Sequence, residues 1–139
     1  MTEPPPLRLF LDRSTCGKRF VQGVRHLVDD VETIADRYGT RPAEDIPDTR
    51  WIADATRDGR ILLGADKRIL REPVERRAVC RARARYVVFG SGNLSTIQLL
   101  ELFERDLPTI RLLTPVPGPW AHRIARHGMD QLVLNCTDA

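Results

Sequence analysis

Short apolar runs alternate with amphipathic segments along most of this chain. Three β-strands are predicted by apolar runs at residues 7–12, 60–65 and 86–89. A short further strand is predicted within residues 28–34, where Asp29 and Asp30 obscure its start. Between these runs, apolar residues recur three or four positions apart, as in helices that bury one face. The strongest such stripe comprises Ile97, Leu100, Phe103 and Leu107, and we expect Pro108 to end this helix.

Alternation of strands and helices predicts an α/β fold with a mainly parallel sheet, because right-handed crossovers join parallel neighbours. The run at 86–89 is apolar throughout, which is typical of a buried parallel strand. Residues 38–48 are interpreted as a polar loop. The end of the chain differs, because residues 120–126 and 131–134 flank a break and predict an antiparallel hairpin at a sheet edge.

Four residues predict where helices begin. Asp48 is expected to cap a helix that Gly59 ends. Pro73 is well placed as the first residue of the next helix. Ser95 and Gln98 have the spacing of a capping box at the start of the last helix.

Length and composition are those of one globular domain with an ordinary core. The chain has 139 residues, of which 42% are hydrophobic and 29% charged. We expect a disordered lead-in at residues 1–6, a single domain at 7–135 and a C-terminal tail at 136–139. No apolar run reaches the length of a membrane span and the N-terminus lacks a signal-peptide pattern, so we expect no membrane contact and a cytoplasmic location.

The number of cysteines and the distribution of charge limit the kinds of site and substrate expected for this chain. Cys16, Cys80 and Cys136 are odd in number and widely spaced, which favours three reduced thiols over a disulfide framework or a zinc ribbon. The net charge is only +3, but residues 67–85 carry eight basic side chains against two acidic ones. A local positive field suits a polyanionic substrate, although a solvated helix face in an arginine-rich chain explains the same pattern.

Asp12 and Asp66 each follow directly on an apolar strand. In an open parallel sheet, functional groups gather just beyond the carboxyl ends of the strands. If the two strands are neighbours, their carboxylates repel each other unless a cation lies between them, which indicates an Mg²⁺ or Mn²⁺ site. Asp48 is a third candidate, because a helix N-terminus tolerates negative charge. The turn at 90–93 should open into the same crevice, where Ser91, Asn93 or Ser95 could supply neutral oxygens.

Several other chemistries fit these residues less well. A phosphate-binding loop would need glycine where Asp12 stands and serine or threonine where Arg19 stands. A phosphoaspartyl phosphatase would need a second aspartate where Ser14 stands. The three histidines are scattered, which disfavours a zinc enzyme or a catalytic triad. A receiver-type phosphoacceptor domain also groups carboxylates at strand ends and stays open as an alternative.

Four segments taken together resemble the PIN-like ribonucleases, and within them the VapC toxins of bacterial toxin–antitoxin pairs. The segments are residues 10–13 with 17–18, 47–52, 60–69 and 91–94, and the resemblance extends over about residues 7–135. It implies a three-layer α/β/α sandwich whose clustered acids hold Mg²⁺ or Mn²⁺ and hydrolyse RNA phosphodiesters.

By their positions in the sequence, the resemblance implies that Asp12, Asp48 and Asp66 are the catalytic and metal-binding acids. The family often adds a fourth acid after the fourth strand, where this chain offers Asn93 as a ligand, directly or through water. Fewer charges mean weaker metal binding, so one or two metals are both compatible with the sequence. We expect contacts to the RNA substrate from Arg13, Lys18, Lys67, Arg68 and Ser91.

The leading interpretation is a metal-dependent endoribonuclease that acts as the toxin of a type II toxin–antitoxin pair. Its expected partners are RNA, a cognate antitoxin protein and a second copy of the chain. The alternative is a non-catalytic nucleic-acid-binding module, which the missing fourth acid permits. Such a module would need no divalent ion, and its affinity would fall steeply with salt.

Overall fold

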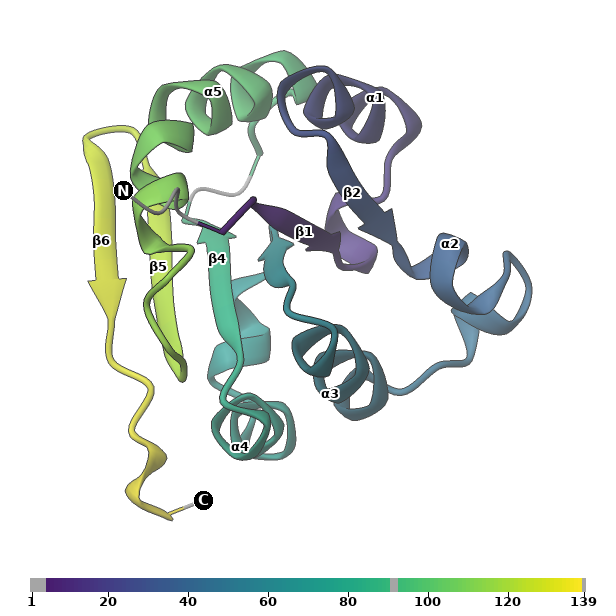
Figure 1. The fold of residues 1–139 in the computed structure, drawn as a ribbon, viewed down its shortest axis with the longest axis vertical. Helices are drawn as coiled ribbons and strands as arrows, with labels where there is room; N and C mark the ends of the chain where they lie inside the picture. Colours follow the sequence, from purple (N-terminus) through teal and green to yellow (C-terminus); the bar gives the residue numbers. More distant parts are fainter. Residues whose placement is uncertain (1–4, 91–92, 139) are drawn as a thin grey trace.

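Six strands form one sheet within residues 5–90 and 93–138, the part of the chain that the computed structural model describes (Figure 1). The order across the sheet is β2–β1–β3–β4–β5–β6. Neighbours from β2 to β5 pair in parallel, and β6 pairs with β5 in the antiparallel sense at the edge. The bounds are Arg8–Leu11 for β1, Asp30–Thr33 for β2, Ile61–Gly64 for β3, Arg85–Phe89 for β4, Trp120–Ala125 for β5 and Gly128–Leu132 for β6.

Helices cover both faces of this sheet (Figure 1). One face carries α1 (Lys18–Leu27) and α5 (Thr96–Leu113). The other carries α3 (Asp48–Arg57) and α4 (Pro73–Ala82). The predicted α/β/α sandwich, with its mainly parallel sheet and C-terminal antiparallel hairpin, is therefore confirmed.

Alternation of side chains along each strand divides the core into two layers. On β1, Leu9 and Leu11 pack toward α1 and α5, whereas Phe10 packs toward α3. All three are fully buried, as expected for parallel strands covered on both faces. The strands are consequently rigid supports for the residues that follow them at the carboxyl edge of the sheet.

Two helix starts differ from the sequence predictions, and a third agrees with them. A short helix, α2 (Ile34–Tyr38), lies where a strand end and a polar loop were predicted, and a capping box of Thr33 and Asp36 begins it. The N-cap of α3 is Pro47 and not Asp48, which is the first helical residue. The capping box of Ser95 and Gln98 at the start of α5 is confirmed.

Pro108 does not end α5, which continues to Leu113. Proline removes one backbone hydrogen bond from the helix interior. On this helix Phe103, Leu107 and Ile110 are buried in the core layer beneath it. Packing of the whole apolar face therefore outweighs the single lost bond.

The prediction of three reduced thiols is wrong, because Cys80 and Cys136 form a disulfide. They are 56 residues apart in the sequence, but the fold brings their Cα atoms to 5.6 Å. The bond ties α4 to the short 3₁₀ turn η4 (Cys136–Asp138). Cys16 is the free, half-buried cysteine.

An ion-pair network lies at the amino ends of the strands, around the buried side chain of Arg60. Its guanidinium bonds the Asp30 carboxylate at 2.7 Å, the Asp58 carboxylate at 3.0 Å and the Leu9 carbonyl at 3.0 Å. Arg8 joins the same two aspartates. This network links β1, β2 and β3 at the edge opposite to their carboxyl ends.

In the described ranges, no helix has both the length and the apolarity needed to cross a membrane.

Candidate metal and nucleic-acid site

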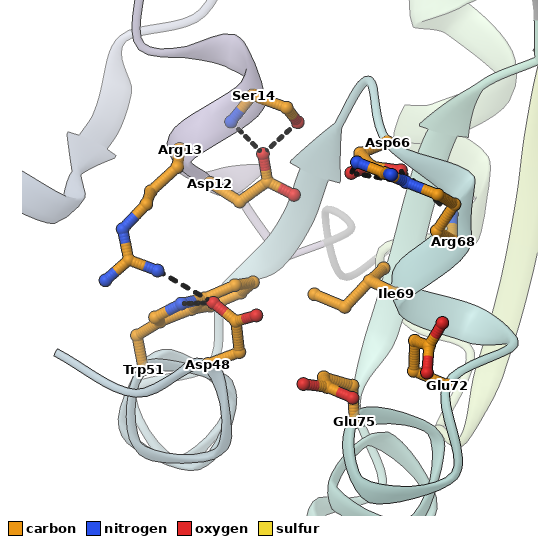
Figure 2. A pocket seen from close by; sticks show the side chains of 10 residues that line it. All are labelled: Asp12, Arg13, Ser14, Asp48, Trp51, Asp66, Arg68, Ile69, Glu72 and Glu75. Atoms are coloured by element: carbon orange, nitrogen blue, oxygen red, sulfur yellow. Dashed lines mark hydrogen bonds and ion pairs between the residues drawn. The ribbon is translucent and has the colours of Figure 1, made fainter.

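Five carboxylates surround one pocket at the carboxyl ends of β1 and β3 (Figure 2). The pocket has a volume of about 430 Å³. β1 and β3 are hydrogen-bonded neighbours, so the residues that follow them share this edge of the sheet. The lining comprises Asp12, Arg13, Ser14, Asp48, Trp51, Asp66, Arg68, Ile69, Glu72 and Glu75.

Asp12 is the most deeply placed of these acids, with only 4% of its surface exposed. Its Oδ1 accepts a hydrogen bond from the Ser14 backbone N–H at 2.8 Å and another from the Ser14 hydroxyl. Its Oδ2 accepts from the Tyr86 hydroxyl. Burial raises the pKa of Asp12 above its ordinary value, and these hydrogen bonds act in the opposite direction.

Gly64, at the end of β3, allows Asp12 to lie against the strand. A side-chain carbon at this position would overlap Asp12 Oδ2 and lie 2.8 Å from its Cγ. Glycine inside a strand often marks such a close approach. The position of the Asp12 carboxylate therefore requires a residue without a side chain at position 64 of the neighbouring strand.

Asp48 extends into the pocket from the first turn of α3. Its Oδ1 accepts from the Trp51 indole N–H at 2.9 Å and from Arg13 Nη1 at 2.9 Å. Arg13 also donates to the backbone carbonyls of Ala43 and Ile46. Asp48 is therefore held by one uncharged donor from its own helix and by one cation from the turn after β1.

Asp66 follows β3 and is paired with Arg68. The guanidinium lies 3.0 Å from Oδ1 and 2.9 Å from Oδ2, and the Arg68 backbone N–H lies 3.0 Å from Oδ1. These bonds keep the pKa of Asp66 below its ordinary value. Asp66 is consequently charged at neutral pH and neutralised by its own neighbour.

Glu72 and Glu75 line the same pocket from the start of α4, whereas in the sequence they stand out only as charges opposing a basic segment. Figure 2 shows both side chains on the wall across from Asp48. The signal available in the sequence was their spacing of three residues at a helix start that closely follows Asp66. They add two acids that were not predicted for the site.

Three further predicted site residues lie elsewhere. Lys18, Lys67 and Asn93 are described by the structure but do not belong to the lining of this pocket. Lys67 instead donates to the Gly90 carbonyl at 3.4 Å, and Asn93 has a left-handed backbone with φ of 64°. Ser91 lies outside the described residues.

Carboxylate oxygens are the ligands that hard divalent cations such as Mg²⁺ prefer. The five carboxylates of this pocket supply the oxygen donors and the negative charge that such an ion requires. In residues 5–90 and 93–138, however, no three acidic, histidine or cysteine side chains are already grouped closely enough to hold one. Arg13 and Arg68 place positive charge beside Asp48 and Asp66.

Comparison with known proteins agrees with this architecture. Residues 7–91 match a family model described as "PIN like domain". A protein of Mycobacterium tuberculosis (strain ATCC 25618 / H37Rv) named "Putative ribonuclease VapC45" is 28% identical over 116 residues, which is 84% of each chain. No solved structure matches this chain at a significant level. Because the family model covers more than half of the sequence, the chain belongs to the PIN-like domain family.

Proposed function

We propose that this protein is a metal-dependent endoribonuclease that acts as the toxin of a type II toxin–antitoxin pair. Membership of the PIN-like family and similarity to a protein named as a ribonuclease support the nuclease part of the proposal. The name VapC of that relative supports the toxin part, and with it a cognate antitoxin as partner. A homodimer and a cytoplasmic location belong to the same proposal.

The observation that carries the proposal is the group of five carboxylates around one pocket. A concentration of like charge at one edge of a sheet costs free energy unless a cation balances it. Asp12, Asp48 and Asp66 are the residues that would hold Mg²⁺ or Mn²⁺, with Asn93 as a further ligand through water. A bound divalent cation would neutralise charge at the scissile phosphate and supply a water of lowered pKa.

Other roles in the reaction, proton transfer and binding of the RNA backbone, would belong to side chains of the protein. One of the three aspartates would accept a proton from the attacking water. Arg13 and Arg68 lie in the lining of the same pocket, where each can exchange a carboxylate partner for an RNA phosphate. Lys18, Lys67 and Ser91 are proposed as further contacts to the RNA backbone.

The test is cleavage of RNA by the purified protein in Mg²⁺, in Mn²⁺ and in EDTA. Cleavage that requires a divalent ion and stops in EDTA supports the nuclease. Arrest of growth on expression, relieved by an antitoxin, supports the toxin. Folded protein that cuts no RNA in either metal contradicts the enzymatic proposal.

The pairing of Asp48 with Arg13 and of Asp66 with Arg68 favours one second candidate, a non-catalytic RNA-binding module. In such a module the arginines would neutralise the acids permanently. Calorimetry separates the two candidates, because the module would bind RNA without taking up Mn²⁺. Its affinity for RNA would also decline strongly between low and physiological salt.

A further inference from the structure

Two aromatic side chains lie behind the carboxylates of Asp12 and Asp48. We propose that Tyr86 and Trp51 act as a positioning pair that holds these two carboxylates at a fixed separation. The inference rests on the proposed function in one respect, since it takes Asp12 and Asp48 as acids that hold the metal.

Tyr86 fixes one side of this arrangement. It lies on β4 with no exposed surface, and its hydroxyl donates to Asp12 Oδ2. A buried hydroxyl needs a hydrogen-bond partner, whereas phenylalanine would fill the same space without that requirement. Because Ser14 holds Oδ1, the bond from Tyr86 to the second oxygen fixes the rotation of the carboxylate.

Trp51 fixes the other side. Its indole N–H donates to Asp48 Oδ1 at 2.9 Å, and only 1% of the residue is exposed. The indole is stacked on Phe10 of β1, with ring centroids 5.5 Å apart and planes inclined by 20°. A side chain packed in this way cannot shift without loss of core contacts, so the core determines where its N–H lies.

The two rings also contact each other. The centroids of Trp51 and Tyr86 are 6.4 Å apart and the planes are inclined by 62°, an edge-on arrangement that aromatic rings favour. The donors to Asp12 and Asp48 therefore belong to one packed unit. Unlike Arg13, these donors carry no charge, so they orient the carboxylates without competing electrostatically with a metal ion.

The first test compares Tyr86→Phe with Tyr38→Phe. Each change removes one phenol hydroxyl that donates to an aspartate, but Tyr38 bonds Asp54, which does not line the pocket. We expect Tyr86→Phe to weaken Mn²⁺ binding by about tenfold or more, as loss of a donor behind a metal ligand does. In RNA cleavage, kcat should fall while KM for RNA changes little. Tyr38→Phe should match the wild type in both measurements.

The second test compares Trp51→Phe with Trp120→Phe. The chain has two tryptophans, and Trp120 donates its indole N–H to the Val116 carbonyl. Trp120→Phe leaves Trp51 as the only indole, so its emission reports directly on Mn²⁺ binding beside Asp48. We expect this emission to change with the midpoint found by calorimetry. Trp51→Phe should weaken Mn²⁺ binding, again by about tenfold.

The outcomes separate this inference from the proposed function. Wild-type Mn²⁺ affinity in both Tyr86→Phe and Trp51→Phe, with unchanged circular dichroism, would overturn the positioning pair and leave the nuclease intact. Wild-type protein that neither binds Mn²⁺ nor cleaves RNA would overturn both. The two variants alter different rings, so unfolding of one leaves the other to decide.

Discussion

The guanidinium of Arg68 bonds both oxygens of the Asp66 carboxylate, at 3.0 Å and 2.9 Å. Arg13 bonds Asp48 in a similar way, through one oxygen at 2.9 Å. A divalent cation that entered the pocket would compete with both guanidinium groups for carboxylate oxygens. The protein thus carries internal counter-ions at two of the three aspartates proposed to hold the metal.

Removal of Arg68 should therefore strengthen metal binding. We expect Arg68→Ala to bind Mn²⁺ about three- to fivefold more tightly at low ionic strength, the range that loss of a surface ion pair can account for. Arg77→Ala is the control, because Arg77 is an exposed residue of α4 that lines a different groove. Calorimetric titration measures both variants. Equal or weaker affinity in Arg68→Ala than in Arg77→Ala would show that the ion pair does not compete with the metal.

A methyl group at position 64 should displace the Asp12 carboxylate. In Gly64→Ala the new carbon would overlap Asp12, and displacement of a reacting group by about 1 Å can cost about 100-fold in rate. The matched control is Gly17→Ala, because a side-chain carbon there meets no atom within 4 Å. We expect RNA cleavage to be lost in the first variant and kept in the second. Full activity in Gly64→Ala would remove Asp12 from the site.

Burial of Asp12 should make stability depend on pH. Its pKa is raised in the folded state, so the folded protein binds this proton more tightly than the unfolded chain does. Stability therefore falls as the pH rises from the pKa of Asp12 in the unfolded chain to its higher pKa in the folded protein. Asp12→Asn is uncharged and should be more stable than the wild type at pH 7. The difference should shrink toward acidic pH, where Asp12 itself is protonated.

Urea unfolding at several pH values measures this effect. Asp29→Asn, a change at an exposed position, provides the control for loss of one negative charge. An Asp12→Asn protein that is less stable than the wild type by the same amount at pH 4 and pH 7 would contradict the electrostatic account.

The ion-pair network at the opposite edge should contribute to stability and not to cleavage. Arg60→Ala removes a side chain that is 8% exposed. It leaves Asp30 without its closest partner and takes one of three arginine partners from Asp58, at a cost of about 2–3 kcal/mol. Arg57→Ala breaks a pair with Asp54 whose arginine is 76% exposed, and should cost less than about 1 kcal/mol. Urea titration measures both costs. A cleavage rate that falls in folded Arg60→Ala would contradict the separation of the two edges.

Local sequence patterns predicted most of the fold. The apolar runs at β1, β3 and β4 are continuous because these strands are buried on both faces, and this property is visible in the sequence. The course of α5 beyond Pro108 could not be predicted, since it depends on the packing of Leu107 and Ile110 against the sheet. The Cys80–Cys136 disulfide was missed for the same reason, as only the fold brings the two residues together.

Some residues of the site could likewise be predicted from the sequence, and others could not. Asp12 and Asp66 could be predicted because each follows an apolar strand. The role of Tyr86 depends on the register between β3 and β4 and on the depth of its side chain, which no local pattern contains. Gly64, by contrast, ends an apolar strand two residues before Asp66, and this signal was available in the sequence.

RNA cleavage in Mg²⁺, in Mn²⁺ and in EDTA tests most directly whether the three aspartates hold a catalytic metal. The variants to compare are Asp12→Asn, Asp48→Asn and Asp66→Asn, with Asp29→Asn as the control. The carboxylate pocket predicts that each of the first three variants stays folded and loses cleavage, whereas Asp29→Asn cuts at the wild-type rate in metal and not in EDTA. Wild-type cleavage by folded Asp66→Asn, or undiminished cleavage in EDTA, would contradict the claim that these aspartates hold a divalent metal for RNA hydrolysis.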